Sequence, residues 1–345
     1  MPEPLAASHY QLFVGVDIAA ASFDASWCRS DGLLHPAQTF PQTPTAFATF
    51  HQQLAMTGSA PGQTLVVLEA TGSYWVALAT SLHAAGYAVA IVNPAHVHNY
   101  AKSLPRRNKT DALDAQLLAR FAAERRPDPW TPPPTVYHEL RQRLVARDGL
   151  LEMRQQARNQ LHALEQWPVR VVEVHQQMLQ VIATLDQQIR SLETAIAQVL
   201  ADGAWAQSAA HLLSVPGIGL VTSAWLLVST VNFTTCTTPE AAAHYAGLTP
   251  LERQSGTSVR GRPRIGHGGN SRLRTALYMA TLSAARYNPM IKSFYTRLRE
   301  AGKPPKLARC AAARKLLHLA FAVVTKRQDF AVSYQKPPSL VWDES

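Results

Sequence analysis

The sequence has 345 residues, too many for one small hydrophobic core and enough for two or three domains. Hydrophobic residues make up 47% and charged residues 16%, which is typical of a folded chain and excludes a disordered one. The three cysteines are widely spaced and form no CxxC pair, so the sequence indicates neither a disulfide framework nor a zinc site. No apolar run reaches the length of a membrane span, so we expect a cytoplasmic protein.

The formal net charge is +10, and its distribution is uneven. Residues 251–327 contain 17 lysines and arginines against 2 glutamates, a net charge of +15, so the rest of the chain carries −5. A basic excess confined to one segment is expected of a nucleic-acid surface. A membrane-surface patch is the alternative, and the lack of a long amphipathic helix with bulky aromatics disfavours it.

The first third of the chain alternates between strand and helix patterns. Strands are predicted at residues 11–17, 25–28, 65–69 and 88–92, and a helix at residues 74–85. This alternation predicts an α/β sheet covered by helices. Asp17 and Glu69 end two of the strands, and open α/β sheets place their functional sites at that edge.

A proline-rich linker at residues 126–134 precedes two long helical patterns. The second has apolar residues at a 4-3 spacing, the seam of a coiled coil: Met178, Ile182, Leu185, Ile189, Leu192, Ile196 and Val199. The first, residues 137–164, is interrupted by Arg147, Arg154 and Arg158. It either packs back on the second or presents its arginines to nucleic acid, and the seam serves pairing within a chain or between chains equally well.

The last part of the chain predicts an all-α domain. A turn at residues 214–219 separates two apolar helices, and further helices are predicted at residues 271–287, 289–301 and 306–326. Residues 247–270 are rich in Gly, Arg and Ser without a clear period, which predicts a loop.

Asp111 and Asp114 are three residues apart at the start of a predicted helix, with Thr110 as its N-cap. At this spacing the carboxylates share a face and repel each other unless a cation lies between them. Together with Asp17 and Glu69 they suit Mg²⁺ and phosphoryl transfer. The alternative is structural, since acids near a helix N-terminus are favoured by its dipole. The preceding basic residues are candidate DNA-backbone contacts: Arg106, Arg107 and Lys109.

Ser255 lies between arginines that can stabilise the charge of an attacked phosphate. By pattern alone, however, an ordinary loop hydroxyl is the favoured interpretation of Ser255. Gly217 and Gly219 form a turn like that of a helix-hairpin-helix, whose backbone amides approach phosphates, or else an ordinary turn between helices. Six arginines of this region are candidate nucleic-acid contacts: Arg253, Arg260, Arg262, Arg264, Arg272 and Arg274.

Over residues 10–330 the sequence resembles insertion-sequence transposases of the IS110 type. The motifs are Val14-Gly15-Val16-Asp17, Leu68-Glu69-Ala70-Thr71-Gly72, residues 107–115 with both aspartates, Val215-Pro216-Gly217-Ile218-Gly219, and Ala246-Gly247-Leu248-Thr249-Pro250 leading into Gln254-Ser255-Gly256.

The resemblance implies three domains. They are a RuvC-like (RNase H-type) domain at residues 10–130, a coiled-coil insert at 135–203 and a helical transposase domain at 208–330. It also implies a DEDD tetrad of Asp17, Glu69, Asp111 and Asp114 that binds Mg²⁺, with Ser255 as the nucleophile that links covalently to DNA.

The same resemblance implies a homo-oligomer, a dimer or a tetramer, in which the tetrad and the serine of one site come from different protomers. The implied partners are donor DNA, target DNA and a bridge RNA encoded by the element. The expected function is therefore transposition by strand exchange. A RuvC-like structure-selective endonuclease that uses water is the alternative, and a non-catalytic nucleic-acid binder is a third.

Overall fold

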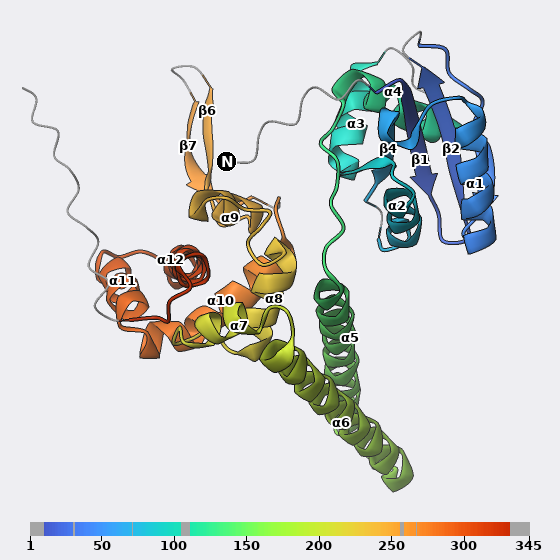
Figure 1. Cartoon of the computed structure of the whole chain (residues 1–345). Coiled ribbons are helices and arrows are strands. Elements are labelled where there is room, and N and C mark those ends of the chain that lie inside the picture. Colours follow the sequence, from blue (N-terminus) through green and yellow to red (C-terminus); the bar gives the residue numbers. More distant parts are fainter. Residues whose placement is uncertain are drawn as a thin grey trace, which may run out of the picture. The chain divides into compact units, whose positions relative to one another are not determined.

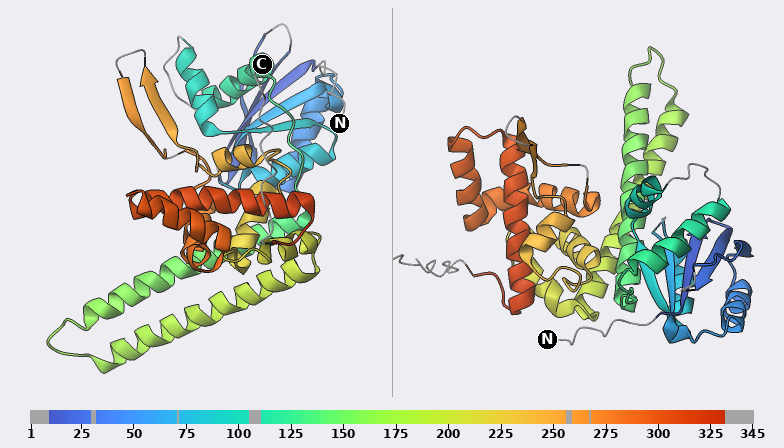
Figure 2. Two further views of the ribbon diagram at one scale, coloured as in Figure 1. Left: turned by 90° about the vertical axis from the view of Figure 1, so that its left-hand side faces the viewer. Right: turned by 90° about the horizontal axis from the view of Figure 1, so that it is seen from above.

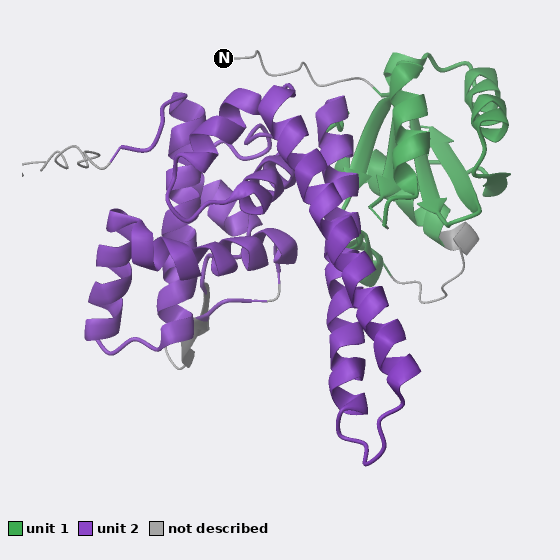
Figure 3. Ribbon diagram, turned by 90° about the horizontal axis from the view of Figure 1, so that it is seen from below, with its two compact units in different colours: residues 1–132 green, residues 133–345 purple. Residues whose placement is uncertain are grey.

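The computed structural model describes residues 10–29, 32–70, 72–104, 111–255, 259–266 and 268–331. Side chains are described within these ranges except at 111–113, 251–255 and 259–263. The chain forms two compact units, residues 1–132 and residues 133–345 (Figure 3). None of the described helices combines the length and apolar character that crossing a bilayer requires.

The first unit is built on a five-stranded mixed sheet with the strand order β3-β2-β1-β4-β5 (Figure 1). Its strands are β1 (Leu12–Ile18), β2 (Ser22–Arg29), β3 (Gln38–Pro41), β4 (Thr64–Glu69) and β5 (Ala88–Val92). β1, β2 and β3 pair antiparallel, whereas β1, β4 and β5 pair parallel. The α/β prediction is confirmed, and this arrangement fits a RuvC-like domain. β3 was not predicted, because four residues are too few to show alternation.

Helices cover both faces of this sheet. Residues Val14, Val16 and Leu68 pack under α1 (Pro44–Met56) and α2 (Trp75–Ala84). Phe13 and Val67 pack under α3 (Pro94–Ser103) and α4 (Asp111–Arg125). Since neighbouring strand residues point to opposite faces, β1 and β4 are buried on both sides and read as continuous apolar runs.

The second unit begins with an antiparallel helical hairpin of α5 (Thr135–Leu164) and α6 (Val172–Asp202), seen in Figure 2. Ile182, Ile189 and Ile196 of α6, which are seven residues apart, are buried. Arg147 of α5 forms an ion pair of 2.7 Å with Glu193 of α6, so α5 packs back on α6 within the chain. Pairing of these helices between copies, as in an oligomeric coiled coil, stays a prediction.

The rest of the second unit is a helical body with one shared core. Its helices are α7 (Ala206–Leu213), α8 (Leu220–Thr230), α9 (Pro239–Tyr245), α10 (Ser271–Tyr287), α11 (Pro289–Glu300) and α12 (Pro305–Lys326). The three helices predicted for the last part of the chain are confirmed to within one residue.

The loop predicted at residues 247–270 is wrong in its central part. There β6 (Leu251–Ser255) and β7 (Val259–Arg264) form an antiparallel hairpin that projects from the helical body (Figure 1). The strand sequences LERQS and VRGRPR lack the alternation of apolar and polar residues that marks a strand, so periodicity did not predict them.

Candidate active site

Two acidic residues lie at the carboxyl ends of neighbouring parallel strands, Glu69 as the last residue of β4 and Asp17 one residue before the end of β1. β1 and β4 pair with Val16 opposite Leu68, so the residues that follow, Asp17 and Glu69, lie side by side at the carboxyl edge of the sheet. Val16 and Leu68 belong to the core under α1 and α2. Because strand residues alternate, Asp17 and Glu69 point to the opposite face, which α3 and α4 cover. Both acids are half-buried.

Helix α4 lies directly on β1 at this face. A Cβ atom on Gly15 would overlap the backbone of Ala115 and Ala119, so α4 rests where β1 has no side chain. Arg126, just after α4, places its guanidinium carbon 5.6 Å from the centroid of the Phe13 ring. α4 therefore runs from the carboxyl end of β1 toward its amino end, and its first turn lies at the carboxyl edge of the sheet.

The first turn of α4 carries the other two acids of the predicted tetrad. Asp111 is the first residue of the helix, and its side chain lies outside the described set. Asp114 is half-buried and directly precedes Ala115, which contacts β1. The topology thus brings the backbone positions of all four acids to one edge of the sheet, from β1, β4 and α4.

The chemistry of these donors fits a hard divalent cation. Mg²⁺ prefers carboxylate oxygens together with water and phosphate oxygens, and clustered carboxylates gain most from a cation between them. The described side chains, which do not include that of Asp111, contain no group of three His, Cys, Asp or Glu residues that could hold a metal ion. A site with three carboxylates at this edge therefore requires Asp111.

One acid of this edge was missed by sequence reasoning. Asp24 of β2 pairs in register with Asp17 of β1, and it accepts a hydrogen bond from the Thr39 hydroxyl. The short turn between β1 and β2 sets which residues of the two strands lie opposite each other; a hydrogen bond from the Ala19 amide to the Ser22 carbonyl closes it. Counting back from this turn places Asp24 opposite Asp17.

Ser255 is the last residue of β6 and pairs with Val259, the first residue of β7, at the end of the hairpin. Its position is thus next to the tip of a projecting element (Figure 1). Residues 256–258 and the Ser255 side chain lie outside the described set. Its role as a nucleophile stays a prediction.

The predicted phosphate-binding residues differ in their surroundings. Arg264 is exposed, whereas Arg272 forms an ion pair of 3.3 Å with Asp148, and Arg274 donates a hydrogen bond of 2.8 Å to the Gly268 carbonyl. Arg272 and Arg274 thus have structural partners within the protein. Six further predicted contacts lie outside the described residues or side chains, the last three of them on the hairpin: Arg106, Arg107, Lys109, Arg253, Arg260 and Arg262.

The two glycines of the turn between α7 and α8 have different environments. Gly217 has φ +101°, and a Cβ atom there would overlap Ala284 of α10, so this glycine is needed for close packing of the turn on α10. Asn288 supports the same turn by donating a hydrogen bond of 3.2 Å to the Pro216 carbonyl. A Cβ atom on Gly219 would meet nothing within 4 Å, so packing does not require a glycine at this position. Contact of the turn with a phosphate stays a prediction.

Two cations on α11 and α12, exposed Arg297 and half-buried Lys315, were not singled out from the sequence. Arg297 of α11 and Lys315 of α12 lie with their charged groups 5.4 Å and 4.8 Å from the centroid of the same ring, that of Phe294. Burial lowers the pKa of Lys315, and the nearby Arg297 lowers it further. Two like charges held beside one ring favour an anionic partner.

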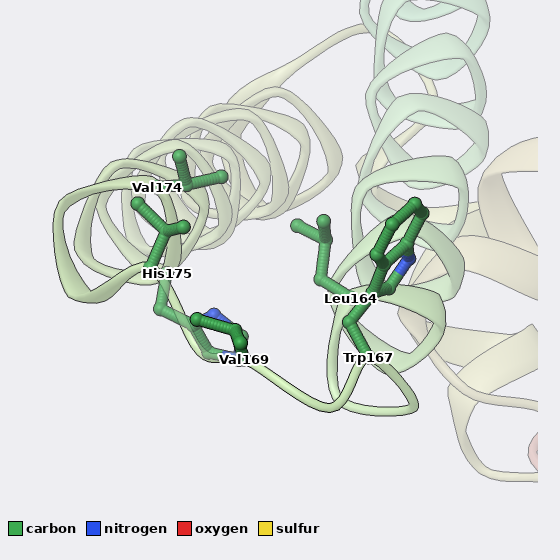
Figure 4. Close-up of a pocket in the computed structure, with 6 residues that line it drawn as sticks. Leu164, Trp167, Val169, Val174 and His175 are labelled. Carbon is green, nitrogen blue, oxygen red and sulfur yellow. The ribbon is translucent and has the colours of Figure 1, made fainter.

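A pocket lies at the end of the α5–α6 hairpin and is apolar (Figure 4). Its lining consists of Leu164, Trp167, Val169, Val171, Val174 and His175. It contains no acidic residue and none of the predicted site residues, so it is not part of the candidate site.

Two family models match the chain. A transposase model of the DEDD IS110 type matches residues 14–166, and a model described as the transposase IS116/IS110/IS902 family matches residues 209–296. The first match contains all four acids of the tetrad, and the second contains Ser255.

Curated relatives agree with these matches. The chain is 31% identical to the pilin gene-inverting protein of Moraxella bovis over 321 residues, which cover 92% of this chain and 97% of that protein. The Moraxella lacunata protein of the same name matches to the same extent. An insertion element IS110 protein of Streptomyces coelicolor is 36% identical over 115 residues, 33% of this chain and 28% of that protein. The chain belongs to the IS116/IS110/IS902 family of transposases.

Proposed function

We propose that this transposase excises and inserts an insertion sequence by Mg²⁺-assisted DNA strand exchange through a covalent serine–DNA intermediate. The observation that carries the proposal is the placement of Asp17 beside Glu69 at the sheet edge where α4 begins with Asp111. Mg²⁺ held by these carboxylates supplies Lewis-acid stabilisation of the charge on the attacked phosphate.

Ser255 provides the attacking oxygen in this proposal. Its Oγ atom loses a proton and bonds to the phosphorus of a DNA phosphodiester, while the bond from phosphorus to one deoxyribose oxygen breaks. The released oxygen takes up a proton and becomes a hydroxyl group. One phosphoester bond forms for each one broken, so a new hydroxyl group can later displace the serine and rejoin DNA without an outside energy source.

The proposed partners are polyanions, in line with the charge of +15 carried by residues 251–327. Donor and target DNA are the substrates, and an RNA encoded by the element is the proposed guide, since the same cations bind RNA phosphates. The protein acts in this proposal as a homo-oligomer in which Ser255 and the tetrad of one site come from different protomers.

Two substitutions test the catalytic roles. Ser255→Ala removes the attacking oxygen, so covalent protein–DNA adducts that survive denaturation are expected to fall to background while DNA binding is kept. Asp17→Asn is expected to abolish both the adducts and all Mg²⁺-dependent cleavage. Ser271→Ala, at the exposed first residue of α10, is the matched control and is expected to leave adducts unchanged.

Each contrary result has a definite meaning. Undiminished adducts in Ser255→Ala would exclude this serine as the nucleophile. Loss of adducts together with full, Asp17-dependent cleavage would instead establish an endonuclease that uses water.

A further inference from the structure

The connection between α5 and α6 exposes several large apolar side chains. Trp167 is 70% exposed, and Val169, Val171 and Val172 are exposed as well. The two helices carry this connection, the hairpin tip (residues 164–175), well beyond the helical body of the second unit (Figure 2). Exposed apolar patches on folded proteins mark interaction sites, so the hairpin tip is a candidate contact surface.

The hairpin tip also contains the apolar pocket described above, with a volume of about 240 Å³. Leu164 and Trp167 lie on one side of it, and Val174 and His175 lie on the other (Figure 4). An apolar cavity of about 150 Å³ is large enough to bind benzene. The pocket can therefore accept the ring of an aromatic side chain.

His175 gives this pocket one unsatisfied polar atom. The side chain is 4% exposed, and its Nε2 atom is buried without a hydrogen-bond partner among the described residues. A buried polar atom without a partner destabilises the folded chain, and a leucine at this position would avoid that cost. A partner that inserts an aromatic ring with one hydrogen-bond donor satisfies the pocket and this nitrogen together.

Trp167 has the side chain that these two features require. An indole combines a large aromatic surface with one N–H group that only donates. Trp167 is mostly exposed, and its indole N–H makes no hydrogen bond within the described part of the chain. The hairpin tip thus carries both halves of one contact, a ring with a donor and a pocket with an acceptor.

The charges of the hairpin tip favour a second copy of this chain over a nucleic acid. Arg170, Glu165 and Glu173 are all exposed, and they give the tip a net charge of −1, whereas residues 251–327 carry +15. A polyanion gains little from such a surface, and two nearly neutral surfaces do not repel each other. A two-fold contact uses the same patch on both copies, so every interaction in it forms twice.

We propose that the hairpin tip binds the hairpin tip of a second copy of this chain. Trp167 of each copy inserts into the pocket of the other, and its indole N–H donates to Nε2 of His175, whose ring proton then lies on Nδ1. Each pocket is complete only with the second copy. The inference rests on the homo-oligomer of the proposed function and assigns the contact to the tip, since the heptad residues Ile182, Ile189 and Ile196 are already buried within one chain.

The test measures the dissociation constant between copies of the full chain by sedimentation, with and without duplex DNA. Trp167→Ala removes the ring and its donor, so we expect association to be at least about tenfold weaker, as for a truncated tryptophan at the centre of an interface. The melting temperature of the dissociated chain is expected to stay at the wild-type value, because an exposed side chain packs little within one copy.

Two other variants complete the test. Tyr287→Ala removes an aromatic ring that is also 70% exposed, at the end of α10, and this matched control is expected to associate as the wild type does. His175→Leu keeps the pocket apolar but removes the acceptor, so association is expected to weaken about two- to tenfold. Its dissociated chain is expected to melt at or above the wild-type temperature, because no unpaired buried nitrogen remains.

Contrary results separate the inference from the proposed oligomer. Wild-type association by Trp167→Ala or by His175→Leu overturns the inference, and an oligomer that persists through another surface leaves the proposed function standing. Equal weakening in Tyr287→Ala also overturns the inference, since the effect would then not be specific to the tip. A wild type that stays monomeric with and without duplex DNA overturns the homo-oligomer and the inference together.

Discussion

At Gly15 the absence of a side chain lets α4 lie on the backbone of β1, and this contact sets the position of the helix turn that carries Asp114. Gly15→Ala forces a methyl group into the backbone of α4. Overpacking of this kind costs about 1–3 kcal/mol, and more where only backbone can yield. We expect a lower melting temperature and loss of Mg²⁺-dependent DNA cleavage, because α4 must move away from β1.

The control for this change is Gly62→Ala, in the short 3-10 helix Pro61–Gln63, where an added Cβ atom meets nothing within 4 Å. It is expected to keep both stability and cleavage. Wild-type cleavage by Gly15→Ala would show that the acids do not depend on close packing of α4.

At the residue scale the sequence was informative where an acid ends or begins an element. Glu69 ends β4, Asp111 begins α4 and Asp17 lies one residue before the end of β1, and the strand and helix patterns beside them were strong enough to mark these ends. Asp24 lies inside a strand, at a position where alternation allows any polar residue. Its relation to Asp17 depends on the register between two strands, which a single strand pattern does not contain.

At the element scale the α5–α6 hairpin shows how a heptad seam and ion pairs act together. Asp186 of α6 forms an ion pair of 2.6 Å with Arg154 of α5. This hydrogen bond from Arg154 holds the pKa of Asp186 below its ordinary value, against the opposing effect of desolvation. The charged carboxylate is therefore the form that the folded hairpin favours.

A carboxyl group whose pKa is lowered on folding stabilises the protein above its ordinary pKa, near 4, and this stabilisation is lost as the pH falls below that value. Asp186→Asn is expected to melt at a lower temperature than the wild type at pH 7, with the gap closing as the pH falls below the ordinary pKa of an aspartate. Thermal melts at several pH values measure the gap. A gap that stays constant on acidification would show that the ion pair does not contribute.

Sequence periodicity predicted elements whose sequences contain an apolar stripe and missed those whose sequences do not. α6 was predicted because its apolar residues repeat at the spacing of a heptad seam. Three of them, Ile182, Ile189 and Ile196, are buried in the structure. β6 and β7 were missed because their sequences lack apolar alternation, and their register comes from pairing with each other. The sequence pattern therefore did not predict that Ser255 lies on a β-hairpin and not in a loop.

At the scale of the whole molecule the dominant feature is charge asymmetry. Residues 251–327 carry +15 while the rest of the chain carries −5. Phosphate contacts release counterions, so each one makes binding more sensitive to salt, by about 0.9 in the slope of log K against log salt on duplex DNA. The change in this slope when a cation is replaced therefore reports how many DNA phosphates that cation contacts, independently of the DNA sequence.

Arg297 and Lys315, which share the ring of Phe294, are the cations for which this count is most direct. Replacing both with glutamine in the full chain is expected to weaken binding to duplex DNA and to lower the salt slope by about 2, if each contacts one phosphate. Arg190→Gln, which removes an exposed charge from α6, is the control and is expected to leave the slope unchanged. An unchanged slope in the double variant would show that other residues of the basic segment make the phosphate contacts. An equal fall in the control would show that the slope reports the total charge of the protein and not contacts between single cations and phosphates.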